Sequence, residues 1–190
     1  TSLSLGNQFN PSNVTNMTRM FYACGYTAMT SLNLGSSFDT SSVTNMQQVF
    51  QNCGYTAMTS LNLGDKFDTS NATKMLYMFR ECGYTAMTSL NLGDKFNTSK
   101  VTNMYGMFNM CGYMKMTSLS LGDKFYTTAV KDMRYMFEGC GNTLMTTLYL
   151  GPAFTSIPNL VNNSSGISES ANANMFSNCG KSGATINVPE

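Results

Sequence analysis

Cysteine recurs every 29 residues along most of this chain, and that regularity constrains the fold more than any other feature. Two rows of phenylalanine and a row of leucine pairs keep the same step. The cysteine row is Cys24, Cys53, Cys82, Cys111 and Cys140, and one phenylalanine row is Phe9, Phe38, Phe67, Phe96, Phe125 and Phe154. Because a repeat this short buries little apolar surface alone, neighbouring repeats must share one core. The sequence therefore predicts a solenoid.

Each repeat divides into two patterned parts. The segment Met29–Leu34 alternates apolar and polar side chains, which predicts a short strand with Leu32 and Leu34 facing inward. Apolar residues at positions 43, 46, 49, 50 and 53 then recur at helical spacing, and Gly54 follows them. This second part predicts an amphipathic helix of about three turns.

We therefore expect an α/β solenoid, a right-handed, leucine-rich-repeat-like coil of 29-residue units with a parallel β-sheet on one face and short helices on the other. The tandem repeats span residues 1–154, and residues 155–190 form an irregular last repeat and C-terminal cap. Cys179 follows Cys140 by 39 residues, which indicates a ten-residue insertion within Pro158–Ala173. The first residues fall in mid-repeat, so we expect a fragment of a longer protein.

Composition argues against several classes of function. The net charge is +1 without a basic stripe, which argues against nucleic-acid binding. No apolar run reaches the roughly 18 residues of a membrane span, so we expect no membrane insertion of this fragment. Histidine is absent and the acids recur as repeat positions, so we expect no enzyme and no cofactor. Low charge with many Ser, Thr and Asn residues favours an extracellular protein.

The cysteines are predicted to be reduced and buried as small core residues. Helices packed about 8–10 Å apart would hold their Cα atoms beyond the roughly 7 Å limit for a disulfide. If the segment is not helical and repeats stack at about 4.8 Å, bridging is open as an alternative. Rows of methionine at inward positions predict core packing, and no metal site is expected.

Two surface rows have alternative interpretations. Tyr26, Tyr55, Tyr84 and Tyr113 follow the glycine at the expected helix end, where a side chain packs back on the helix. Such a row could instead stack on sugars or on partner side chains. The pairs Asp65-Lys66, Asp94-Lys95 and Asp123-Lys124 predict a solvated charge ladder rather than a calcium site.

The outer face of the predicted helices varies most between repeats, and it is our preferred binding site. Tyrosine and arginine are favoured as interface anchors, and here they gather on neighbouring repeats. The candidate residues are Tyr77, Arg80, Tyr105, Arg134 and Tyr135. The alternative is unselected variation on a solvated face. On the sheet face, the candidates are Asn33, Asn62, Asn91 and Tyr149, and the alternative there is hydrogen bonding between stacked repeats.

The repeat also resembles a known family. The resemblance is carried by Phe67-Asp-Thr-Ser-Asn-Ala-Thr-Lys-Met-Leu-Tyr-Met-Phe79, followed by Cys82 and Leu90-Asn-Leu92, and by Ser41-Ser-Val-Thr-Asn-Met46. These units resemble BspA-like leucine-rich-repeat surface proteins, in the branch found in mycoplasma-type lipoproteins and gut Firmicutes. The resemblance covers nearly the whole chain, up to about Phe154. It implies a bacterial surface protein with a role in adhesion.

We therefore expect a non-catalytic, extracellular module on a bacterial cell surface that binds a protein or glycan of a host or neighbouring cell. The alternative is a purely structural stalk or spacer in a larger surface protein.

Overall fold

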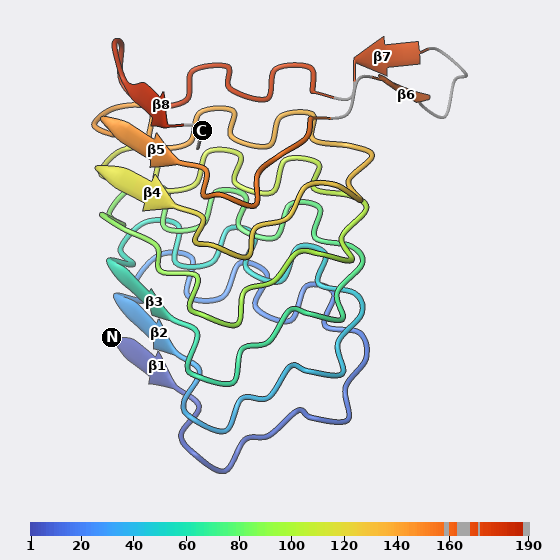
Figure 1. Ribbon diagram of the computed structural model, residues 1–190. Coiled ribbons are helices and arrows are strands. Elements are labelled where there is room, and N and C mark those ends of the chain that lie inside the picture. Colours follow the sequence, from blue (N-terminus) through green and yellow to red (C-terminus); the bar gives the residue numbers. More distant parts are fainter. Residues whose placement is uncertain (158–159, 163–167, 171, 188–190) are drawn as a thin grey trace.

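The chain winds into a parallel β-solenoid of about five turns, with like residues spaced by 29 positions (Figure 1). The computed structural model describes residues 1–157, 160–162, 168–170 and 172–187. We number the coils 1 to 6 as residues 1–29, 30–58, 59–87, 88–116, 117–145 and 146–187. The predicted solenoid and its period are confirmed, whereas the right-handed sense of the coil stays a prediction.

Each coil begins with a strand segment on one face of the solenoid. Strands β1 (Ser2–Ser4), β2 (Ser31–Asn33) and β3 (Ser60–Asn62) form one parallel sheet. Strands β4 (Ser118–Ser120), β5 (Thr147–Tyr149) and β8 (Thr185–Asn187) form a second. Partners lie in register, as in Leu32 opposite Leu61, and these leucines are buried. The predicted parallel sheet is therefore confirmed, although the strand segment of coil 4 joins neither half.

A hairpin projects from the side of the last coil (Figure 1). Its strands β6 (Leu160–Asn162) and β7 (Ser168–Ser170) pair in antiparallel fashion. They fall within the insertion predicted at Pro158–Ala173. The other central positions of that insertion, 158–159, 163–167 and 171, lie outside the described residues.

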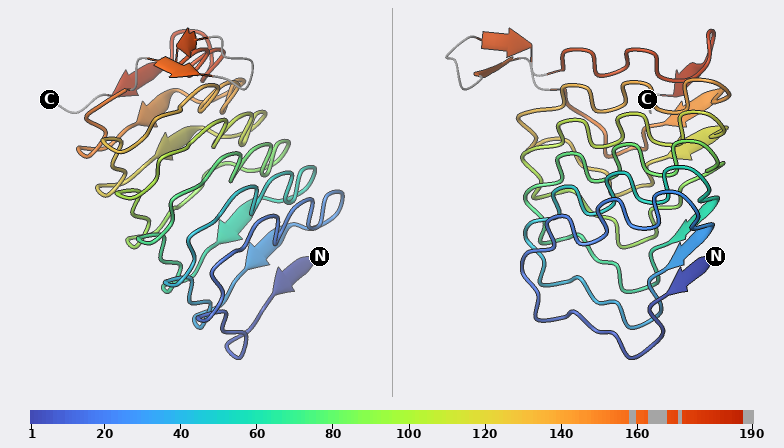
Figure 2. Two further views of the ribbon diagram at one scale, coloured as in Figure 1. Left: turned by 90° about the vertical axis from the view of Figure 1, so that its right-hand side faces the viewer. Right: turned by 180° about the vertical axis from the view of Figure 1, so that it is seen from behind.

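The predicted helices are wrong: the described residues form no α-helix. In their place each coil runs through two consecutive tight turns, which Figure 2 shows as a zigzag. In coil 1 the N–H groups of Met20 and Cys24 donate to the carbonyls of Met17 and Phe21, three residues earlier, at 3.1 Å. The N–H groups of Arg19 and Phe21 donate instead to the next coil, to the carbonyls of Gln47 and Val49 at 3.0 and 2.9 Å.

Stacking distance explains why the zigzag replaces a helix. Strands that hydrogen-bond across coils set a rise of about 4.8 Å, whereas helices need about 8–10 Å. A flat zigzag fits the strand rise and lets alternate N–H groups bond to the neighbouring coil, as strands do. One residue of each turn takes a left-handed backbone conformation, with φ between 52° and 65°. In coils 1 to 5 these are Arg19, Gln48, Tyr77, Gly106 and Tyr135 in the first turn, and Ala23, Asn52, Glu81, Met110 and Gly139 in the second.

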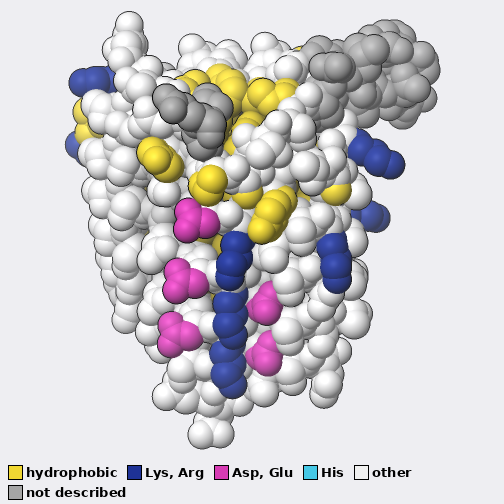
Figure 3. Space-filling model, viewed as in Figure 1, with side chains coloured by type: hydrophobic (Ala, Val, Ile, Leu, Met, Phe, Trp, Pro, Cys, Tyr) yellow, Lys and Arg dark blue, Asp and Glu magenta, His cyan; other side chains and the backbone are white. Residues whose placement is uncertain are grey.

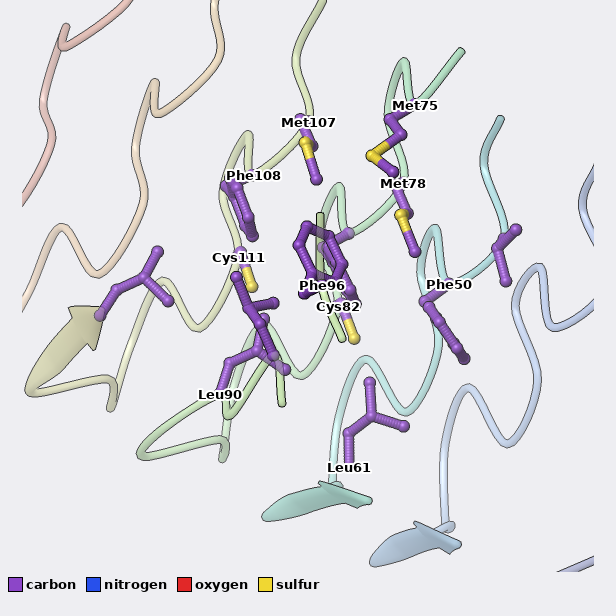
Figure 4. Close-up of a cluster of buried hydrophobic side chains, with 14 of the residues drawn as sticks. Phe50, Leu61, Met75, Met78, Cys82, Leu90, Phe96, Met107, Phe108 and Cys111 are labelled. Atoms are coloured by element: carbon purple, nitrogen blue, oxygen red, sulfur yellow. The ribbon is translucent and has the colours of Figure 1, made fainter. Parts of the chain in front are cut away.

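The core consists of side-chain columns that run along the solenoid axis (Figure 4). One column stacks phenylalanine rings from successive coils, with centroids 5.4 to 5.5 Å apart and nearly parallel planes. Its members are Phe21, Phe50, Phe79, Phe108, Phe137 and Phe176. Methionines such as Met75 and Met107 are fully buried beside it, which confirms the prediction that the methionine rows fill the core.

The cysteines form another buried column. Cys53, Cys82, Cys111 and Cys140 have no exposed surface, and all six cysteines are free thiols. Burial raises the pKa of the Cys111 thiol to about 12. The prediction of buried core cysteines is confirmed for these four, whereas Cys24 and Cys179 are partly exposed. Its reasoning was wrong, because no helices hold the coils apart.

Candidate functional site

The outer corners of the zigzag place the predicted patch residues on one face. The first turn presents the pairs at positions 76–77, 105–106 and 134–135 of coils 3, 4 and 5, and the second presents 80–81, 109–110 and 138–139. Asx turns start the first corners of coils 4 and 5: the side-chain oxygens of Asn103 and Asp132 accept hydrogen bonds from the N–H groups of Tyr105 and Arg134, at 3.0 and 3.1 Å. Coils 3 to 5 therefore align their variable side chains.

Three tyrosine rings meet at this face. The Tyr77 and Tyr105 centroids lie 5.1 Å apart in an edge-to-face arrangement, and those of Tyr105 and Tyr135 lie 5.4 Å apart. In coil 4 the left-handed corner position is Gly106, and the ring of Tyr77 packs over it. Because Gly106 has no side chain, the Tyr77 ring can occupy the space above it, and tyrosines from three coils can contact one another.

Two arginines are held against these rings. The guanidinium carbon of Arg80 lies 5.1 Å from the Tyr77 centroid, and that of Arg134 lies 5.0 Å from the Tyr105 centroid. Such cation–π contacts contribute about 0.5–1 kcal/mol at exposed sites. The Asp132 carboxylate also fixes Arg134 through two of its nitrogens, at 2.9 and 3.1 Å. The Nε of Arg80 is buried and finds no hydrogen-bond partner among the described residues.

A shallow cleft of about 170 Å³ opens between these side chains, lined by Tyr77, Arg80, Tyr105, Asn109, Tyr135 and Glu138. Asn109 donates a hydrogen bond to the Glu138 carboxylate at 2.9 Å, which orders one wall. Sequence reasoning missed Asn109 and Glu138 as site residues. Their position in the repeat could have identified them. Asn109, Glu138 and Arg80 occupy equivalent positions of coils 4, 5 and 3, four residues after the first corner residue.

The environment of Tyr105 keeps its phenol neutral. Burial, followed by a hydrogen bond with Tyr77 and the nearby phenols of Tyr77 and Tyr135, raises the pKa of Tyr105 to about 12, against a smaller opposing effect of Arg134. The cleft lining presents the tyrosine hydroxyl groups, the Arg80 guanidinium, the Asn109 amide and the Glu138 side chain. These groups suit hydrogen bonding and ring stacking to a ligand.

The alternative residues on the sheet face are arranged differently. The side-chain oxygens of Asn33, Asn62 and Asn91 each accept a hydrogen bond from the glycine N–H two residues later, at 3.0 Å. The amide oxygen is thus occupied within its own coil. Bonding of this row between repeats comes from the backbone, as in the bonds from Leu5 and Leu34 N–H to the Asn33 and Asn62 carbonyls, both at 3.0 Å. Tyr149 is half exposed on the same face. Asn91 also lines a hollow between coils 4 and 5, but the four residues do not converge on one cleft.

The tyrosine row that follows the glycines stacks on itself. Ring centroids of Tyr26, Tyr55, Tyr84 and Tyr113 lie 4.6 to 4.8 Å apart with nearly parallel planes. At the next step Asn142 replaces tyrosine and donates to the Tyr113 hydroxyl at 2.6 Å. The predicted packing against a helix end is wrong because there is no helix; each ring packs between its neighbours.

Charged side chains form a striped face beside the Phe38 row. Figure 3 shows a column of basic side chains with acidic ones on both sides. Hydrogen bonds from Ser41, followed by the charges of Lys66 and Lys95, lower the pKa of the Asp39 carboxyl. Among the described residues, no group of three or more Cys, Asp or Glu side chains is placed to hold a metal ion.

Comparison with known proteins identifies one family. The sequence profile described as "Mycoplasma protein of unknown function, DUF285" matches residues 4–84 and 54–146, two overlapping stretches that together cover most of the chain. No curated protein and no solved structure shows a significant match. The described part of the chain contains no helix with the length and apolar character needed to cross a membrane.

Proposed function

Because the chain belongs to the Mycoplasma-type repeat family DUF285, we propose that it is a non-catalytic binding module on a bacterial cell surface, of the BspA-like type. Its ligand is a protein or glycan exposed on a host or neighbouring cell. The absence of histidine from the sequence supports a non-catalytic role.

The observation that carries this proposal is the convergence of three tyrosines and Arg80 from coils 3 to 5 around one cleft, with Arg134 stacked on one of the tyrosine rings. The equivalent first-turn corners of coils 1 and 2 carry Thr18-Arg19 and Gln47-Gln48 instead. A purely structural stalk needs no such local cluster. Tyrosine and arginine bury large surfaces and bond at the same time, which is why they dominate the energetics of interfaces.

The test is a binding screen of the fragment against glycan arrays and extracts of host-cell surfaces, repeated with Tyr77→Ala/Tyr105→Ala/Tyr135→Ala. We expect saturable binding that the triple variant weakens at least tenfold. A matched control, Tyr26→Ala/Tyr55→Ala/Tyr84→Ala, removes an equal number of rings from the other tyrosine row and should retain binding. Equal binding by the wild type and the cleft variant would refute the proposed site.

A structural spacer is the second candidate. It is favoured by the hydrogen bonds that join every pair of adjacent coils along the axis. A spacer shows no saturable binding to any ligand in the same screen, so one experiment separates the two functions.

A further inference from the structure

The parallel sheet is interrupted at coil 4. Elsewhere the leucine that ends a strand donates to the next coil: Leu34 to the Asn62 carbonyl and Leu121 to the Tyr149 carbonyl, both at 3.0 Å. Coils 3, 4 and 5 are described throughout, and within them the N–H groups of Leu63 and Leu92 make no such bond. Figure 1 accordingly shows one trace without an arrow between β3 and β4.

The glycines that follow the strands give independent evidence that coil 4 is separated from its neighbours. At the closed steps, a β-carbon built on Gly64 would come within 2.3 Å of the Gly35 carbonyl oxygen, and one on Gly151 within 2.1 Å of that of Gly122. At Gly93 and Gly122 the same construction meets nothing within 4 Å. The backbones of coils 3, 4 and 5 have therefore moved apart at this turn.

The gap between coils 4 and 5 is a bounded slit. Thr117 N–H donates to the Thr88 carbonyl at 3.2 Å on one side of the opening, and Thr98 N–H donates to the Lys124 carbonyl at 3.1 Å on the other. On the zigzag face the same two coils stay joined, as in the bond from Phe108 N–H to the Met136 carbonyl at 2.8 Å. At the turn after the strand, Lys124 Nζ also donates to the Asp94 carbonyl at 3.1 Å. The slit is therefore open along the strand segment, bridged at the turn by one lysine side chain, and closed at both ends and behind.

Two connected hollows of about 300 and 330 Å³ lie along this slit, lined by residues 89–94, 96, 118 and 120–124. The apolar walls include Phe96 and Leu121, which are otherwise buried. The Leu92 N–H on one lip and the Ser120 carbonyl on the other have no backbone partner. Backbone groups in such positions are nearly always paired, with protein, water or a ligand.

We propose that this slit binds a short extended peptide, which inserts as an additional parallel strand between coils 4 and 5. Each edge of a parallel strand carries alternating N–H and carbonyl groups, so an inserted strand offers a carbonyl to the Leu92 N–H on one side and an N–H to the Ser120 carbonyl on the other. The side chains at the slit mouth include Ser118 and Ser120, which are small and polar. This activity is separate from the Tyr77 cleft, which lies on the zigzag face.

The test uses the capped peptide acetyl-Ser-Leu-Ser-Leu-Gly-amide, the sequence of residues 118–122. We expect saturable binding by calorimetry and slower hydrogen exchange at Leu92 when the peptide is present. A peptide N-methylated at both leucines, which cannot donate those hydrogen bonds, should bind at least tenfold more weakly. The triple variant of the Tyr77 cleft should bind the peptide like the wild type, which keeps this test independent of the proposed function.

A disulfide staple gives the matched control. Asn91→Cys/Ser120→Cys places a cysteine pair across the slit, and Asn33→Cys/Asn62→Cys places one across the closed step between β2 and β3. Oxidation should abolish binding in the first variant, reduction should restore it, and the second should bind in both states. The proposal is overturned by failure of the wild type to bind, by binding that survives the slit staple, or by Leu92 exchange in the free protein as slow as that of Leu34.

Discussion

The ring of Tyr77 occupies the space that a side chain on Gly106 would need: a β-carbon there would come within 2.6 Å of the ring. Gly106 also has φ of 56°, a conformation that disfavours other residues. The cleft therefore depends on a glycine that none of its lining side chains reveals.

Gly106→Ala should displace the Tyr77 ring and destabilise the fold by about 1–2 kcal/mol, through backbone strain and the ring contact together. Urea unfolding measures the free energy, and near-ultraviolet circular dichroism follows the tyrosines. Gly6→Ala is the control, because Gly6 has φ of 69° with nothing within 4 Å. An equal loss in both variants would show that the Tyr77 contact contributes nothing.

Tyr84→Ala should destabilise the protein more than Tyr26→Ala, because Tyr84 stacks on two rings and Tyr26 on one. Each stacked pair contributes about 0.5–1.5 kcal/mol beyond burial. Thermal unfolding of the two variants provides the comparison. Identical midpoints would contradict an energetic role for the stacking.

Tyr105 should make stability depend on alkaline pH. Its folded pKa of about 12 lies above the ordinary value of 10, so the folded state holds this proton more tightly than the unfolded state. The resulting stability is fully present below pH 10 and is lost as pH rises towards 12. Tyr105→Phe should therefore lose less stability than the wild type between these limits in urea titrations. Parallel losses in the two proteins would contradict the assignment.

The four interior thiols should resist modification. Only the thiolate reacts, and burial raises the pKa of Cys53, Cys82, Cys111 and Cys140. An Ellman assay at about pH 8 should show slow reaction of these four thiols in the native protein and rapid reaction of all six under denaturant. Rapid native labelling of Cys82 would indicate that the coils open readily.

The period of the repeat made much of this fold predictable. Leucines at 32 and 61 alternate with polar residues, and they do lie opposite each other in a parallel sheet. The 29-residue offset also placed Tyr77 and Tyr135 at equivalent corners of one face, two coils apart. These features follow because equivalent residues of successive repeats stack on each other, and the 29-residue period can be read from the sequence.

The zigzag was missed because its apolar spacing is shared with a helix. Met46, Phe50 and Cys53 face inward at steps of four and three, which suits two consecutive four-residue turns equally well. The distinguishing signal was chemical. Asn45 starts an Asx turn, and Asn52 occupies a left-handed position that asparagine tolerates better than most residues. Capping residues in mid-pattern therefore argued against a continuous helix.

The slit between coils 4 and 5 left no trace in the sequence. Residues 89–93 read Ser-Leu-Asn-Leu-Gly, as do residues 31–35 and 60–64, yet only the latter two segments pair with each other. Residues 118–122 on the other side of the slit read Ser-Leu-Ser-Leu-Gly, but so do residues 2–6, which pair with β2. The residue types of these segments therefore do not distinguish an open step from a closed one.

The alternate N–H groups that cross from each zigzag to the following one have an evolutionary consequence. Each coil presents the same hydrogen-bonding edge to the coil that follows it. The solenoid can therefore gain or lose whole coils while the contacts between the remaining coils are kept. Unequal recombination within the gene would then generate proteins with different numbers of coils and the same cross-section. Natural selection could adjust the length of the solenoid without any change in its core.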